Sequence, residues 1–80
     1  MGLPIATQRG FIRDKLEAAF PGASIEVKDT TGGDDHFDVT IKAEAFAGHT
    51  MIEQHRMVYA ALGARVGREI HALALTTGTP

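Results

Sequence analysis

The stretch HFDVTIKAEAFAGHTMIEQHRMVYAAL, residues 36–62, changes its hydrophobic period partway along and thereby indicates the class of the fold. Residues 36–43 alternate between apolar and polar side chains, which is typical of a half-buried strand. Thr50 and Glu53 then have the T-x-x-E spacing of a capping box, in which each side chain accepts a hydrogen bond from the other residue's backbone N–H. We therefore predict a strand over residues 36–43 and a helix that starts at Thr50.

The segments on either side predict another helix and two more strands. After Pro4, apolar residues recur at helical spacing until PG at residues 21 and 22, which should end the first helix. SIEVKD, residues 24–29, alternates in the manner of a strand, and EIHALAL, residues 69–75, is expected to be the last strand. The first two strands are joined by DTTGGDD, residues 29–35, a length that suits a flexible loop.

The order helix, strand, strand, short turn, helix, strand implies an α+β domain with two helices behind a three-stranded mixed sheet. The second helix connects strands two and three, so these strands should be parallel if they are adjacent, with a right-handed crossover. A chain of 80 residues has room for one small core. We therefore expect residues 1–80 to form a single domain.

Composition narrows the classes of function. The net charge is −2, from eight basic and ten acidic residues, which differs from the basic stripe of a typical nucleic-acid binder. The absence of cysteine excludes disulfides and any thiolate site made by this chain alone. No apolar run approaches the roughly 20 residues needed to span a bilayer, and the N-terminal residues do not resemble a signal peptide. We expect a soluble, cytoplasmic protein.

The second helix is expected to run to about Val66, with Gly67 as a left-handed C-cap. On a helical wheel, its apolar stripe consists of Met51, Ile52, Val58, Tyr59, Leu62 and Val66. His55 falls at the centre of this stripe, so we interpret it as a packed, structural histidine and not as a ligand. Arg56, at the edge of the stripe, can extend to solvent.

The opposite face of that helix carries little charge, and its residues include Glu53, Met57, Ala60, Ala64 and Gly67. Two interpretations stay open. Alanine is simply a good helix former, or the flat face is a docking surface for another protein. The candidate residues for binding a partner are Met57, Ala60, Ala64 and Arg56.

The other three histidines are His36, His49 and His71. His49 lies in the turn before the helix and is expected to be exposed. A structural zinc site needs four protein ligands, and the spacings HxxxH, HExxH and CxxC are all absent. His36 and His71 therefore form at most an incomplete metal site, which a second molecule would have to complete.

The chain resembles the BolA-like family over most of its length. The resemblance rests on the order and spacing of four segments: GGDDHFDVTI, FAGHTMIEQHRMVYAAL, REIHALAL and TGTP. It implies a KH-like (class II) α+β fold, in agreement with the patterns above. It also implies a role in iron–sulfur handling and iron homeostasis. We expect no enzymatic activity, because cysteine is absent, Ser24 lies on a predicted strand, and no paired nucleophile and base can be proposed. The isolated chain would bind no cofactor and would be a monomer or a weak homodimer.

The partner implied by the resemblance is a monothiol glutaredoxin, which shares a [2Fe–2S] cluster with the BolA-like protein. In the family, the glutaredoxin and glutathione supply sulfur ligands. The BolA-like protein supplies the histidine of its I-H-A strand, here His71, and a His or Cys from the loop between its first two strands, here His36.

The sequence departs from the family pattern in two informative places. Gln54 stands where the pattern R-H-R has its first arginine. The loop contains no cysteine, and His36 lies at the strand edge, so Asp34 or Asp35 stay open as harder, poorer alternatives for the second ligand.

A KH-like fold also suggests an alternative function as a nucleic-acid-binding transcriptional regulator. Arg56, Arg65 and Arg68 are the candidate phosphate contacts. KH domains clamp the nucleic-acid backbone with a GxxG loop, which this chain lacks, and the acidic GGDD segment would repel phosphate.

Overall fold

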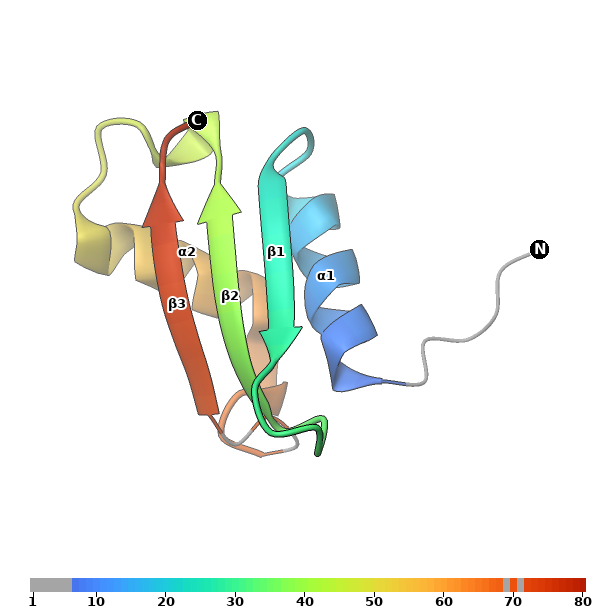
Figure 1. Cartoon of the computed structure of the whole chain (residues 1–80). Helices are drawn as coiled ribbons and strands as arrows, with labels where there is room; N and C mark the ends of the chain where they lie inside the picture. The colour runs from blue at the N-terminus through green and yellow to red at the C-terminus, as the bar shows by residue number, and fades with distance from the viewer. Residues whose placement is uncertain (1–6, 69, 71) are drawn as a thin grey trace.

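The computed structural model describes residues 7–68, 70 and 72–80 and confirms the expected order of elements (Figure 1). These elements are helix α1 (Gln8–Ala19), strand β1 (Ser24–Asp29), strand β2 (His36–Lys42), the 3-10 turn η1 (Glu44–Phe46), helix α2 (Met51–Leu62), the 3-10 turn η2 (Gly63–Arg65) and strand β3 (Ala72–Gly78). Of the helices within the described part of the chain, none has the length and apolar character needed to cross a membrane.

The three strands form one mixed sheet in the order β1-β2-β3. β1 and β2 are antiparallel, with Ile25 opposite Ile41, and β2 and β3 are parallel, with His36 opposite Ala72. Both helices lie on the same face of this sheet (Figure 1). The predicted α+β class, the mixed sheet and the parallel pairing across α2 are thus confirmed.

The core lies between the sheet and the two helices. Its buried residues are Ile12, Leu16, Phe20, Val27, Phe37, Val39, Ile41, Ala43, Phe46, Val58, Leu62 and Ile70. The alternation over residues 36–43 predicted the buried face of β2 correctly. Phe46 comes from the short link before α2 and is completely buried. Its ring packs against that of Phe20 in a tilted arrangement, with the centroids 5.1 Å apart and an interplanar angle of 50°. The link therefore contributes to the core as well as joining two elements.

The start of α2 is as predicted, but its end is not. The N–H of Thr50 donates to Glu53 Oε1 (2.9 Å), and the N–H of Glu53 donates to Thr50 Oγ1 (3.2 Å), which completes the capping box. The helix ends at Leu62 and not near Val66, because Gly63 has a φ of 73° and its N–H donates to the carbonyl of Tyr59. A glycine takes this left-handed conformation without steric cost, so Gly63 ends the helix before the expected Gly67.

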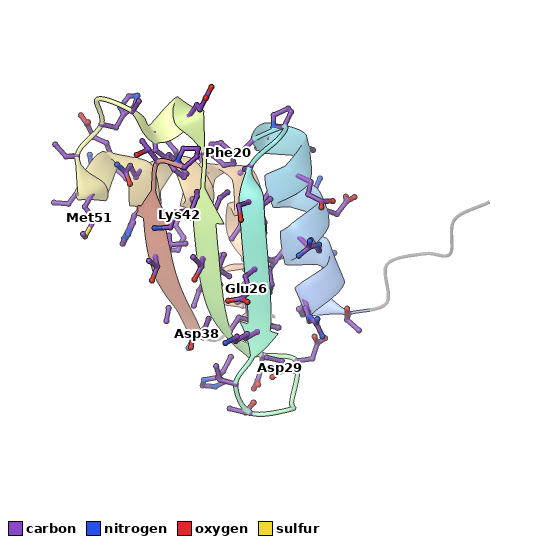
Figure 2. The ribbon with its side chains drawn as sticks, turned by 45° about the horizontal axis from the view of Figure 1, so that its top comes forward. Phe20, Glu26, Asp29, Asp38, Lys42 and Met51 are labelled. Atoms are coloured by element: carbon purple, nitrogen blue, oxygen red, sulfur yellow. The ribbon has the colours of Figure 1, made fainter. Side chains whose placement is uncertain are left out.

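The buried face of α2 differs from the predicted stripe. Three large apolar side chains of the predicted stripe are exposed in the structure: Met51 (69% exposed), Ile52 (67%) and Tyr59 (39%). Figure 2 shows Met51 at the outer end of the helix. Val58 and Leu62 are buried, whereas His55 is only half-buried, so its expected place at the centre of a buried face is wrong. The reason is geometric: the sheet and α1 cover the side of α2 that also carries Ala61, and the apolar stripe is wider than the surface they cover.

Two other boundaries differ from the sequence prediction. α1 begins at Gln8, because Thr7 has an extended backbone and its hydroxyl accepts from the N–H of Gly10 as an N-cap. Pro4, the expected start, lies outside the described residues. β3 covers Ala72–Gly78 and extends three residues beyond the predicted end at Leu75, while the predicted residues Glu69 and His71 also lie outside the description.

Candidate functional site

His36 is the first residue of β2 and follows directly on the acidic loop. Its side chain is 45% exposed, and its Nε2 lies 3.8 Å from the nearer carboxylate oxygen of Asp35. An imidazole at the end of a strand has its direction set by the strand backbone, which distinguishes it from a side chain at a loop tip. His36 therefore meets the first requirement of a ligand, a defined position near the surface.

The loop before His36 is folded around the carboxylate of Asp29. This carboxylate accepts hydrogen bonds from the backbone N–H groups of Thr31 (3.2 Å), Gly32 (2.9 Å) and Asp34 (2.9 Å). Figure 2 shows Asp29 at the end of β1, where the loop starts. Desolvation acts to raise the pKa of Asp29, but these hydrogen bonds together with the charge of Arg9 outweigh it, so the pKa lies below its ordinary value of 3.8. The pattern is an extended form of the Asx turn, and the segment DTTG was the sequence signal for it.

Asp34 joins the loop to α1. Its Oδ2 accepts from the N–H of Gln8 (2.8 Å) and its Oδ1 from the N–H of Arg9 (3.2 Å), so its side chain caps the first turn of the helix. The backbone of Asp34 has a φ of 60°, a left-handed conformation that Asp tolerates better than most residues. Both oxygens of Asp34 are thus engaged within the fold, which argues against Asp34 as the alternative metal ligand.

His71 itself lies outside the described residues, but both of its neighbours in the sequence are described. Ile70 is completely buried, and Ala72 pairs with His36 in the parallel ladder. The N–H of Ala72 also donates to the carbonyl of Asp35 (3.2 Å). The β1–β2 loop and the described part of the connection from α2 to β3 lie at the same end of the sheet (Figure 1).

The donor set of the described residues does not by itself make a metal site. Among residues 7–68, 70 and 72–80, no group of three or more His, Asp or Glu side chains is placed to hold a metal ion. His36 with Asp35 offers one imidazole and one carboxylate, fewer than the four ligands of a closed site. A metal group at this end of the sheet would need further ligands from elsewhere.

The remaining histidine, His49, is exposed as expected. Its Nδ1 lies 3.4 Å from Glu53 Oε1, beside the capping box of α2. The hydrogen bond from the N–H of Thr50 lowers the pKa of Glu53, and His49 adds to this against an opposing effect of desolvation. His49 is therefore part of the helix cap.

The predicted partner-binding residues divide into two groups. Met57 is half-buried and contacts the core, so its expected place on the face opposite the core is wrong. Ala60, Ala64 and Arg56 are exposed. These three residues are therefore accessible to a partner protein.

The predicted phosphate-binding arginines also differ in their surroundings. Arg56 and Arg68 are exposed, but Arg65 is half-buried against α1. The guanidinium carbon of Arg65 lies 4.0 Å from the centroid of the Phe11 ring, and its Nη1 donates to Gln8 Oε1 (3.0 Å). Arg65 therefore contributes to the packing of η2 against α1 as well as to the surface charge.

Gln54 has a structural role that the sequence did not reveal. Its amide nitrogen donates to the carbonyls of Phe46 (3.3 Å) and His49 (2.9 Å), and its Oε1 accepts from the hydroxyl of Thr77 (2.6 Å). It thus holds the turn before α2 and the end of β3 together. The only sequence signal was its departure from arginine, which did not indicate these contacts.

Comparisons with known proteins extend these observations. The family described as "BolA-like protein" matches residues 16–80. The "DNA-binding transcriptional regulator BolA" of Escherichia coli (strain K12) is 36% identical over 75 residues, which cover 85% of this chain and 71% of that protein. "BolA-like protein 1" of Homo sapiens is 36% identical over 76 residues, and the match covers 86% of this chain but only 56% of the human protein. The solved structure of BolA1 from Arabidopsis thaliana has a TM-score of 0.85 at 26% identity and covers 95% of each chain.

Proposed function

Since this chain belongs to the BolA-like family, we propose that it is an adaptor that shares a [2Fe–2S] cluster with a monothiol glutaredoxin through His71 and His36. The observation that carries the proposal is the pairing of His36 with Ala72, the residue that follows His71 in the sequence. In a parallel pair, both strands enter the sheet at the same end. The proposal therefore assigns both imidazoles to that end.

The folded loop supports the part given to His36. Three backbone N–H groups converge on Asp29, and Asp34 fastens the loop to α1, so the residues leading into His36 are held by hydrogen bonds. A ligand whose support is fixed loses little freedom on binding a metal. The hydrogen-bonded loop therefore supports His36 as the second ligand, although the loop contains two glycines.

The chain's chemistry requires a partner for the remaining ligands. It has no cysteine, so the sulfur ligands would come from the glutaredoxin and from glutathione. Imidazole in place of thiolate on one iron raises the reduction potential of such a cluster, as it does in Rieske centres. The proteins similar to this chain are named as regulators or BolA-like proteins, which agrees with a role without catalysis.

The test is anaerobic reconstitution with ferrous iron, sulfide and glutathione, followed by visible absorption and circular dichroism. Three samples are compared: this chain alone, a monothiol glutaredoxin alone, and the two together. The mixture should give a spectrum that differs from that of the glutaredoxin alone, and both proteins should elute together in gel filtration. A mixture whose spectrum equals the sum of the separate samples, with no shared elution, would falsify the proposal.

Nucleic-acid binding is the second candidate. The observation in its favour is that the E. coli relative, 36% identical, is named a DNA-binding transcriptional regulator. Arg56 and Arg68 would be the phosphate contacts, because both are exposed. A titration of duplex DNA at increasing salt tests this function: the logarithm of the binding constant should fall with a slope of roughly one per phosphate contacted. Arg56→Ala should reduce that slope.

A further inference from the structure

A basic groove lies between α1 and the C-terminal end of α2. Its volume is about 420 Å³, which is within the range of pockets that take a small ligand or a few side chains. Its lining includes Phe11 and Lys15 of α1, Ala61 of α2, Ala64 and Arg65 of η2, and Arg68 in the following turn. All charged residues among its described lining residues are basic.

Two of the cations are positioned on one aromatic ring. The guanidinium carbon of Arg65 lies 4.0 Å from the ring centroid of Phe11, and Nζ of Lys15 lies 5.7 Å from the same centroid. Gln8 holds the Arg65 side chain with a hydrogen bond of 3.0 Å. Among the described residues, no carboxylate is within ion-pair distance of Lys15 or Arg68. Positive charge is therefore gathered at this groove, although the whole chain carries a net charge of −2.

We propose that this groove binds an acidic segment of a partner protein. Carboxylate side chains complement Lys15 and Arg68 at its rim, and Arg65 is already held in place. The groove also offers apolar surface, from Ala61 and Ala64, against which an apolar side chain of the same segment can lie. Alanine side chains allow the backbone of a bound segment to approach closely.

A peptide fits this groove better than a nucleic acid. Single-stranded nucleic acids bind to basic grooves by stacking their bases on exposed aromatic faces. The face of Phe11 beneath Arg65 is covered by the guanidinium at 4.0 Å, so that face is closed to a base. A peptide carboxylate needs only the cations. The groove does not include His36 or its loop, so the inference does not rest on the proposed cluster-sharing function.

The test uses a fluorescein-labelled peptide of repeated Asp-Glu-Leu units, with binding followed by fluorescence anisotropy. Arg68→Glu and Lys15→Glu should each weaken binding about tenfold, because each converts an attraction at the rim into a repulsion. The matched control is Lys28→Glu on β1, which makes the same change of charge at a 66% exposed side chain on the opposite face of the sheet. It should leave the affinity within about twofold of wild type. Far-ultraviolet circular dichroism verifies that each variant is folded.

Two results would overturn the inference. The first is that all three variants lower the affinity equally, or that the peptide does not bind at all. Either outcome would show that the groove is not the binding site. The second is an oligo-dT strand of matched charge that binds more tightly than the peptide and loses affinity in Arg68→Glu and Lys15→Glu. That result would assign the groove to nucleic acid.

Discussion

The carboxylate of Asp34 accepts a hydrogen bond of 2.8 Å from the backbone N–H of Gln8, a residue 26 positions earlier in the chain. The N–H groups of the first helical turn have no partner within the helix and need a cap. In α1, Thr7 caps Gly10, and Asp34 caps Gln8 and Arg9. The loop that carries the proposed ligand His36 is therefore fixed to the scaffold by a helix cap.

Replacing Asp34 should loosen both the loop and the helix. Asp34→Ala removes two caps and places alanine at a φ of 60°, so it should lower the free energy of unfolding by about 1–3 kcal/mol. Asp34→Asn tolerates this φ and keeps one acceptor oxygen, so it should lose less. Urea denaturation gives the stabilities, and hydrogen exchange at Gln8 and Arg9 should quicken. Unchanged exchange in Asp34→Ala would mean that the cap contributes nothing in solution.

The carboxylate of Asp29 predicts a loss of stability in acid. Its pKa is lower in the folded state than its ordinary value of 3.8, so folding is favoured by its ionised form. This contribution is fully present above about pH 4 and is lost as the pH falls through the folded-state pKa. The stability difference between wild type and Asp29→Asn should therefore be constant near neutral pH and shrink below pH 4 in urea titrations. Asp38→Asn, on the open face of the sheet, controls for the change in net charge.

The three hydrogen bonds of Gln54 predict a destabilised variant. Gln54→Ala leaves the hydroxyl of Thr77 and two carbonyl groups without this partner, which should cost about 1–3 kcal/mol. Gln54→Arg can still donate to the carbonyls but cannot accept from Thr77, so it should fall between Ala and wild type. Melting temperatures from thermal unfolding give the order of stability of these variants. The control is Arg56→Ala, which changes an exposed residue on the same helix. Equal melting temperatures for Gln54→Ala and Arg56→Ala would contradict the role given to Gln54.

His55 should matter less to stability than its position on the helical wheel suggested. It is half-buried, so His55→Ala leaves no closed cavity and should lower the free energy of unfolding by about 1 kcal/mol or less. Val58→Ala, at a completely buried position on the same helix, provides the comparison and should cost more, about 1–3 kcal/mol. The midpoints of denaturant unfolding measure the stability lost in each variant. A loss of stability in His55→Ala as large as that in Val58→Ala would support a core histidine after all.

Substituting either of the two proposed ligands, His71 or His36, should change the shared cluster but leave the fold intact. His71→Ala should abolish the spectrum of the mixed complex, and His36→Ala should weaken or shift it, because the Asp35 carboxylate or water can substitute only poorly. His49→Ala is the matched control, since His49 is exposed and lies in the helix cap, and its spectrum should equal that of wild type. Visible circular dichroism reads the cluster and far-ultraviolet circular dichroism reads the fold. A mixed complex of His71→Ala with the wild-type spectrum would refute this ligand assignment.

Features that depend on residues close together in the chain could be predicted from the sequence. The alternation over residues 36–43 predicted which side chains of β2 are buried, and Thr50 with Glu53 predicted the start of α2. The parallel pairing of β2 with β3 followed from the helix that connects them. Each of these inferences reads a period, a cap or a connection, all of which are set by backbone geometry over a few residues.

Features that join distant segments could not be predicted from the sequence and emerged only from the folded structure. The wheel of α2 defines an apolar stripe but not the angle at which the helix lies against the sheet and α1, so Ile52 and Tyr59 are exposed although they belong to the stripe. The hydrogen bond between Asp34 and Gln8, and that between Gln54 and Thr77, 23 residues away, were likewise not predictable from the sequence. Such contacts form only after the core has brought the elements together, because no local period or cap encodes which surfaces will meet.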